Sequence, residues 1–162
     1  MPGTLYIIGL GLCDHEDITL RGMRYLKTCS VLFLEAYTSI LANGVSSEEL
    51  SEIYEKPVKT ADRTLVESEA DQIIGPCIKG ENVGLLIVGD PVCATTHTDI
   101  MIRAREVNVE VVVVHNASVM GAAGSCGLQL YSFGQTVSIP FFEGEWRPYS
   151  FYEVSKRSEA NL

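Results

Sequence analysis

Three short segments of small and polar residues each follow an apolar run, and they hold the side chains best suited to binding a ligand. They are residues 9–12, 89–97 and 115–119. In the second, Gly-Asp-Pro at the end of a strand would bring the carboxylate of Asp90 to the edge of a sheet, where open α/β sheets bind ligands. A carboxylate accepts hydrogen bonds from hydroxyl or amine groups, and glycines let a ligand approach the backbone. The three segments therefore indicate a site for a small polar ligand.

The first two segments also have structural interpretations. Residues 9–12 can form a tight strand-to-helix connection, because Asp14 stands where the dinucleotide-binding fingerprint requires its third glycine. Thr95 or Thr96 can cap the helix that follows. His97 is then either a structural histidine in the first helical turn or a catalytic base.

The third segment and a fourth strand end leave similar alternatives. Ser118 can cap a helix or bind a polar group of a ligand. Glu35 ends another apolar run and either faces the same cleft or is solvated. His15 and His115 have no partners at metal-ligand spacing, so we expect no metal site.

Apolar runs alternate with amphipathic segments along the chain, which predicts an α/β fold: a mainly parallel five-stranded sheet with helices on both faces. The expected strands are residues 5–10, 31–34, 56–60, 83–88 and 109–114, and the expected helices are residues 17–28, 46–54, 62–74 and 96–107. Asp17 is the expected N-cap of the first helix, and Ser46 with Glu49 forms an expected capping box in the second. Gly75-Pro76 should end the third helix.

The composition changes near residues 116–127, where glycines precede an aromatic-rich end of the chain. We therefore expect an N-terminal α/β domain over residues 1–117. Residues 118–162 are expected to be a linker and the beginning of an incomplete second α/β domain, with a strand at residues 136–141. About 40 residues are too few to bury a core alone.

Bulk properties exclude several classes of protein. The 162-residue chain has a formal net charge of -9, from 12 basic and 21 acidic residues, so direct nucleic-acid binding is not expected. No apolar run is long enough to span a membrane, and the N-terminus lacks a secretory signal, so we expect a cytoplasmic protein. The cysteines are widely scattered, without disulfide or zinc spacing: Cys13, Cys29, Cys77, Cys93 and Cys126.

Several motifs, spread in order over the whole chain, resemble the diphthine synthases of the tetrapyrrole-methylase superfamily. The similarity lies in residues 5–12, 17–19, 34–39, 89–97, 115–118 and 126–131. This resemblance implies a cleft that binds S-adenosylmethionine and yields S-adenosylhomocysteine. It further implies a methyltransferase, active as a homodimer, that modifies a histidine derivative on translation elongation factor 2 in diphthamide biosynthesis.

Carried over by motif, the resemblance implies five cofactor-binding residues: Leu12, Asp90, Cys93, Ser118 and Val119. Relatives usually have glycine where this chain has Cys93. No catalytic residue is assigned, because the cofactor carries the reactivity and the protein supplies proximity and orientation.

Two other functions stay open from the sequence. Relatives carry a complete second domain, so the chain is alternatively a truncated, catalytically inactive fragment that only binds. It is also alternatively a tetrapyrrole (precorrin-type) methyltransferase of the same fold. An oxidoreductase is disfavoured because the third fingerprint glycine is absent.

Overall fold

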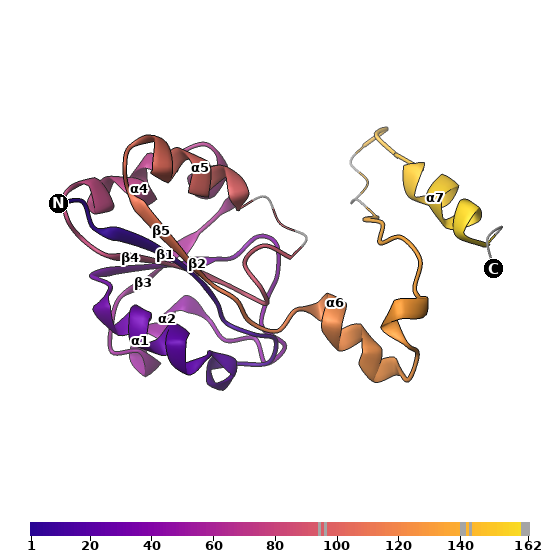
Figure 1. Ribbon diagram of the computed structural model, residues 1–162, viewed down its shortest axis with the longest axis horizontal. Coiled ribbons are helices and arrows are strands. Elements are labelled where there is room, and N and C mark those ends of the chain that lie inside the picture. Colours follow the sequence, from indigo (N-terminus) through magenta and orange to yellow (C-terminus); the bar gives the residue numbers. More distant parts are fainter. Residues whose placement is uncertain (94, 96, 140–141, 143, 160–162) are drawn as a thin grey trace. The chain divides into compact units, whose positions relative to one another are not determined.

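The computed structural model describes residues 1–93, 95, 97–139, 142 and 144–159 (Figure 1). The chain divides into two units, Met1–Ala122 and Ala123–Leu162. The predicted boundary between residues 117 and 118 stays a prediction.

A single parallel sheet organises the first unit, with the strand order β3-β2-β4-β1-β5 (Figure 1). Its strands are β1 (Thr4–Gly9), β2 (Val31–Glu35), β3 (Val58–Ala61), β4 (Val83–Ile87) and β5 (Glu110–Val114). Every residue of β4 is buried, as expected for a central parallel strand covered on both faces. The sheet confirms the predicted fold class and all five predicted strands, with ends shifted by a few residues.

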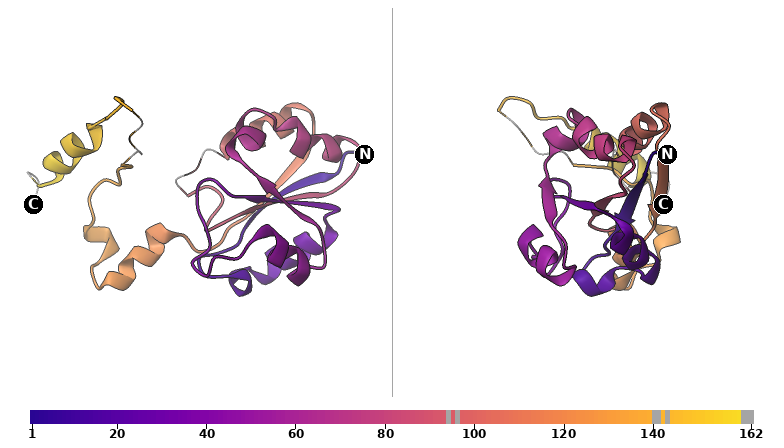
Figure 2. Two further views of the ribbon diagram at one scale, coloured as in Figure 1. Left: turned by 180° about the vertical axis from the view of Figure 1, so that it is seen from behind. Right: turned by 90° about the vertical axis from the view of Figure 1, so that its left-hand side faces the viewer.

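Helices cover both faces of this sheet (Figure 2). One face carries α1 (Leu20–Thr28) and α2 (Ser47–Ile53), and the other carries α3 (Arg63–Glu67), α4 (Asp71–Ile78) and α5 (Thr98–Glu106). Successive strand side chains point to opposite faces. Ile7 therefore packs in the α3–α5 layer and Ile8 in the α1–α2 layer.

The helix ends test the predicted caps. Ser46 and Glu49 form the predicted capping box at the start of α2. Asp17 was wrongly expected to cap the first helix: it ends a 3₁₀ turn, η1 (His15–Asp17), and the hydroxyl of Thr19 caps α1 instead by accepting from Gly22 N–H at 3.0 Å. The reason is that the Asp17 carboxylate binds two other backbone N–H groups, described below.

The third predicted helix is two helices. The chain breaks between α3 and α4, and Gly75-Pro76 lies inside α4 rather than at its end. A proline removes only one helical N–H donor, and α4 ends two residues later, so the loss affects little of the helix. The prediction that Gly75-Pro76 stops this helix is wrong.

The second unit contains short helical elements. They are η2 (Ala123–Cys126), η3 (Leu130–Ser132) and α7 (Ser150–Glu159); α6 (Val119–Ala122) ends the first unit. Residues 136–139 of the predicted strand 136–141 are not a strand, and residues 140–141 lie outside the described residues. A strand needs a neighbouring strand for its hydrogen bonds, and the described part of this unit offers none. The start of a second α/β domain stays a prediction.

The core makes a matched pair of isoleucine truncations informative. Ile7 on β1 is fully buried, whereas Ile102 on α5 is 50% exposed. We expect Ile7→Ala to lower the free energy of unfolding by about 2–5 kcal/mol and Ile102→Ala by less than about 1 kcal/mol, because only the first leaves a cavity. Urea unfolding followed by circular dichroism measures both. Equal losses would contradict the described packing of β1.

Candidate functional site

A crevice lies just beyond the carboxyl ends of β1 and β4, which are paired neighbours in the sheet. The chain leaves β1 toward α1 on one face and leaves β4 toward α5 on the other face. Ligands of open α/β sheets bind at such a reversal, outside the carboxyl ends of the strands. The topology therefore selects this edge before any side chain is considered.

Glycines line this crevice because two backbones meet there. Gly89 N–H donates to the carbonyl of Gly11 at 2.7 Å, in an isolated antiparallel bridge just beyond the strands. Both residues have positive φ, 84° at Gly11 and 79° at Gly89, a conformation that glycine adopts at little cost. A Cβ added to Gly9 would lie 2.6 Å from the carbonyl oxygen of Gly89.

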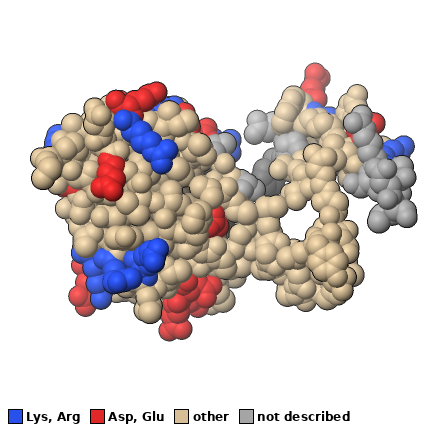
Figure 3. Space-filling model, viewed as in Figure 1, with Lys and Arg blue, Asp and Glu red and all other residues tan. Residues whose placement is uncertain are grey.

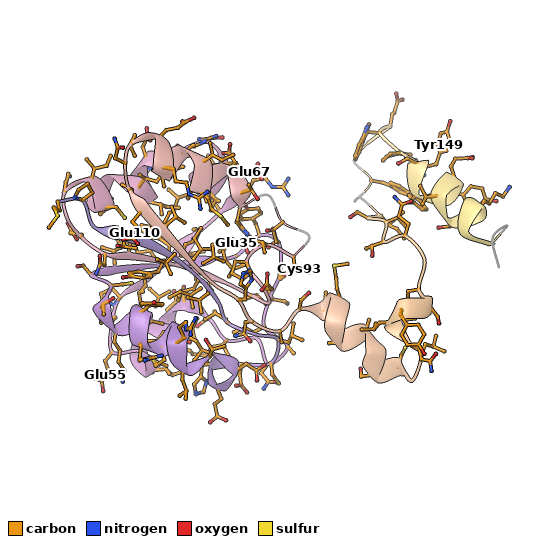
Figure 4. The ribbon with its side chains drawn as sticks, viewed as in Figure 1. Glu35, Glu55, Glu67, Cys93, Glu110 and Tyr149 are labelled. Carbon is orange, nitrogen blue, oxygen red and sulfur yellow. The ribbon has the colours of Figure 1, made fainter. Side chains whose placement is uncertain are left out.

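A cleft of about 520 Å³ opens at this edge. Its walls come from the loops after four strands, and we call it the main cleft: Leu12, Thr38, Ser39, Ile40, Ala42, Val88, Gly89, Asp90, Cys93, Thr95, Ser118 and Val119. All five residues named from the sequence lie in it. Figure 4 shows Cys93 and Glu35 toward one end of the sheet and Glu110 toward the other.

Three hydrogen bonds hold the carboxylate of Asp90 in the lining of the main cleft. Its Oδ1 accepts from Val92 N–H at 3.0 Å, and its Oδ2 accepts from Asn116 N–H at 3.2 Å and from His115 Nδ1 at 2.8 Å. Because a carboxylate only accepts, Nδ1 of His115 carries the hydrogen. A carboxylate has about four acceptor positions, and these contacts fill three of them. The position that remains, on Oδ1, is free for a ligand donor.

The carboxyl of Asp90 stays ionised through these contacts. Burial alone would raise its pKa, but hydrogen bonds from Val92 N–H, His115 and Asn116 N–H together lower the pKa below the ordinary value of 3.8. Its side chain is 11% exposed. The cleft therefore presents a fixed negative charge at neutral pH.

Asn116 ties three segments together. Its Nδ2 donates to the carbonyls of Gly9 at 2.9 Å and Asp17 at 3.0 Å, and its Oδ1 accepts from Ala117 N–H at 2.7 Å. One side chain thus joins the end of β5 to the end of β1 and to η1.

Asp17 shapes the wall that holds Leu12. Its Oδ2 accepts from the N–H groups of Leu12 at 3.0 Å and Cys13 at 2.8 Å. These bonds, from Cys13 first and Leu12 second, lower the pKa of Asp17 below 3.8. This contact is why the carboxylate is not available to cap α1.

Ser118 caps a helix, one of the two roles that the sequence left open, and its binding of a ligand stays a prediction. Its Oγ accepts from Met120 N–H at 3.1 Å, which caps α6, and its hydroxyl donates to Sγ of Cys93 at 2.9 Å. Cys93 thus lies in hydrogen-bond contact with the loop after β5. Like the other four cysteines, it is free.

The histidine and threonines of the Gly89–His97 loop are structural where they are described. His97 is 1% exposed and its Nδ1 lies 3.0 Å from the carbonyl oxygen of Pro91, which supports the structural interpretation. Thr95 donates to the same carbonyl at 2.8 Å and does not cap α5, whose N-cap residue is His97. Thr96 lies outside the described residues.

The loop after β2 forms a fourth wall, for which the sequence singled out only Glu35. It contributes Thr38, Ser39, Ile40 and Ala42. Glu35, buried and neither solvated nor in the main cleft, holds this loop by accepting from Tyr37 N–H, Thr38 N–H and the Thr38 hydroxyl at 2.7–3.1 Å. The sequence signal that could have found this loop is the predicted strand at residues 31–34. The carboxyl end of a parallel strand must reach the same edge of the sheet as the other strand ends.

The site combines one fixed carboxylate, small residues and apolar surface. The apolar contribution comes from Leu12, Val88 and Val119, beside hydroxyls from Thr38 and Ser118. This suits a ligand with a polar end and an apolar body, and the volume is within the range of small-molecule sites. Among the described residues, no group of three His, Cys, Asp or Glu side chains could hold a metal ion.

Surface charge and helix hydrophobicity are two further features of the described residues. In the face shown by Figure 3, the lysines and arginines over the first unit fall into separate groups with acidic side chains nearby. No helix in the described residues is long and apolar enough to cross a membrane.

The lowered pKa of Asp17 predicts an acid-dependent stability. The contribution of the ionised Asp17 carboxylate to the stability of the fold is fully present above the ordinary pKa of 3.8. It is lost as the pH falls through the lower pKa of the folded state. Asp17→Asn keeps an oxygen for the two N–H groups but removes the charge. We expect the variant to melt below the wild type at about pH 5 and the gap to shrink toward about pH 3. Differential scanning calorimetry measures it, and a gap independent of pH would contradict this role.

Comparison with known proteins identifies a family. The model of the family "Tetrapyrrole (Corrin/Porphyrin) Methylases" matches residues 4–160. The chain is 54% identical over 153 residues to the diphthine methyl ester synthase of Schizosaccharomyces pombe, covering 94% of this chain and 53% of that protein. It is 56% identical over 149 residues to the Kluyveromyces lactis protein of the same name, covering 92% and 49%.

A solved diphthine synthase structure superimposes with a TM-score of 0.85 at 30% identity, covering 98% of this chain and 61% of that one. The chain thus spans about half the length of the curated relatives it matches. Since the family model matches nearly the whole chain and the sheet agrees with the solved structure, the chain belongs to the tetrapyrrole methylase family and is similar to diphthine methyl ester synthases.

Proposed function

We propose that this chain is an S-adenosylmethionine-dependent methyltransferase, or the cofactor-binding part of one, that acts in diphthamide biosynthesis. The observation that carries the proposal is that Leu12, Asp90, Cys93, Ser118 and Val119, named from three separate motifs, line a single cleft at the topological switch point. Family membership supports the reaction class, and the relatives' names support the pathway.

The residues present fit this cofactor. Gly11 and Gly89 bring two backbones close to the cleft, and the free acceptor position on Oδ1 of Asp90 suits a hydroxyl or ammonium donor. Leu12, Val88 and Val119 offer apolar surface for a flat heterocycle. The fixed charge of Asp90 favours a cationic ligand over a neutral one.

When bound, the cofactor supplies an electrophilic methyl group. The chain's own contribution is to bind, orient and exclude water. Asp90 is suited to this because its geometry is set by Val92, His115 and Asn116 before any ligand arrives. A preset hydrogen-bond acceptor loses little entropy on binding.

The proposed acceptor is the modified histidine of translation elongation factor 2. The support is the name shared by the relatives, diphthine methyl ester synthase, at 54–56% identity. We further propose that the protein works in the cytoplasm and associates as a homodimer, as the resemblance implies; sedimentation velocity tests the second point. Two alternatives remain, a tetrapyrrole acceptor and a fragment that binds without turnover. The methyl-transfer assay described below distinguishes them from the proposed function.

Asp90 gives the sharpest test of the cofactor. We expect Asp90→Ala to weaken binding of S-adenosylhomocysteine by about 10- to 100-fold, the range for loss of one hydrogen bond to a charged group. Isothermal titration calorimetry measures the affinity. Asp71→Ala, which removes an exposed aspartate in the first turn of α4, is the matched control and should bind as the wild type does. Unchanged affinity in a folded Asp90→Ala or Asp90→Asn variant would contradict the assignment.

Transfer of labelled methyl groups identifies the acceptor. The donor is radiolabelled S-adenosylmethionine, and the acceptor is purified elongation factor 2 that carries the unmethylated histidine derivative. Label on the factor supports the proposal. Cofactor binding without transfer favours the binding-only fragment, and label on an added precorrin-type tetrapyrrole favours the tetrapyrrole enzyme.

A further inference from the structure

A second cavity adjoins the main cleft. It has a volume of about 440 Å³ and shares Ser39, Ile40 and Val88 with the main cleft. We call it the side cavity, and its walls are Leu34, Glu35, Ala36, Ser39, Ile40, Leu41, Gly44, Val45, Ser46, Ser47, Glu48, Thr60 and Val88. The loop after β2 thus borders both spaces.

Hydroxyl groups line part of the side cavity. Oγ of Ser47 lies 2.9 Å from Oγ1 of Thr60, which joins the start of α2 to β3. Ser47 is 8% exposed. Its Oγ also donates to Oε2 of Glu48 at 3.2 Å. The polar end of the cavity therefore has the buried hydroxyl of Ser47 between the exposed hydroxyl of Thr60 and the carboxylate of Glu48.

The charged residues of this lining are both acidic. They are Glu35 and Glu48, and the lining contains no lysine, arginine or histidine. Hydrogen bonds from its own backbone N–H, Ser46 and Ser47 lower the pKa of Glu48, so it is ionised at neutral pH. Glu35 is fully buried, accepts three hydrogen bonds and donates none, and no ion pair among the described residues includes it.

This charge pattern selects the chemistry of an occupant. A buried carboxylate without a counter-ion is costly, and a ligand cation close to it is favoured. An anionic ligand would meet two negative charges and no positive one. The side cavity is therefore suited to an ammonium or imidazolium group and unsuited to a polycarboxylate.

Methyl transfer requires the acceptor next to the methyl donor, in line with the bond that breaks. Two cavities that share three residues at one sheet edge meet this need: one for the donor and one for the acceptor. We propose that the side cavity binds the cationic amine group of the methyl acceptor, with Glu48 and Glu35 as its counter-charges and the Ser47–Thr60 pair as its hydrogen-bonding end. This inference rests on the proposed methyltransferase function.

Choline and its neutral isostere 3,3-dimethylbutan-1-ol test the charge preference, because they match in shape and differ in charge. Each compound is titrated into the ¹⁵N-labelled chain up to roughly 50 mM and followed by NMR. This concentration is far above the millimolar dissociation constant expected of so small a ligand. The backbone amides of Ser39, Ser47 and Thr60 report the side cavity, and the amide of Ser118 reports the main cleft. We expect saturable shifts at the side-cavity amides with choline and at least about fivefold weaker binding of the alcohol.

Two variants locate the charges. We expect Glu48→Gln to weaken choline binding about two- to fivefold, as for an exposed ion pair, and Glu35→Gln by about tenfold or more. Glutamine at position 35 keeps an oxygen for the N–H groups of Tyr37 and Thr38. The matched control is Glu106→Gln, at the end of α5 on the opposite edge of the sheet, which should bind choline as the wild type does.

The outcomes separate this inference from the proposed function. Equal binding of choline and the alcohol, no saturable shift at the side-cavity amides, or unchanged choline affinity in both Glu48→Gln and Glu35→Gln would overturn the acceptor site. Binding of S-adenosylhomocysteine is measured on the same samples. Its retention shows that the cofactor assignment stands even where the acceptor assignment fails, and its absence in the wild type counts against the proposed function itself.

Discussion

The site depends on the close approach of two backbones just beyond β1 and β4. The N–H of Gly89 donates a hydrogen bond to the carbonyl of Gly11 at 2.7 Å. There is no room for a side chain at Gly9, because an added Cβ would lie 2.8 Å from Cβ of Asn116. This approach brings the first two loops of the candidate site together. The amide of Asn116 then adds the loop after β5, because it donates to the carbonyls of Gly9 and Asp17. The remaining walls are positioned relative to these contacts.

Carboxylates hold the loops in place by accepting from backbone N–H groups. Asp17 binds the loop of Leu12, Asp90 binds its own loop and that of Asn116, and Glu35 binds the loop after β2. A backbone N–H is a donor that every loop offers, and an ionised acceptor makes a stronger bond than a neutral one. The main cleft is therefore largely formed in the chain alone, which is the condition for a cofactor site that orients its ligand.

Periodicity predicted the five strands because parallel strands buried on both faces are continuous apolar runs, as at Val83–Ile87. The edge of the sheet at which the site lies followed from that pattern. Local rules failed where a side chain had two sets of partners: Asp17 satisfies the pattern of an N-cap, but Gly11, at φ 84°, brings the N–H groups of Leu12 and Cys13 to it instead. Thr38 and Ser39 lie in the motif at residues 34–39, but sequence reasoning assigned them no place in the cleft, because they reach it only through the order of the strands. Residues 136–139 have the composition of a strand, but the described part of their unit contains no neighbouring strand to pair with.

Alkylation of Cys93 tests most directly the claim that the loops after β1, β4 and β5 form one cofactor site. Cys93 lies in the main cleft beside Ser118, whereas the exposed Cys126 belongs to the other unit and serves as an internal reference. The rates of iodoacetamide labelling are measured by peptide mass spectrometry with and without saturating S-adenosylhomocysteine. The account predicts that the ligand slows labelling of Cys93 and leaves Cys126 unchanged. Equal labelling of Cys93 in both conditions, with calorimetry showing the ligand bound, would place the cofactor elsewhere and contradict the account.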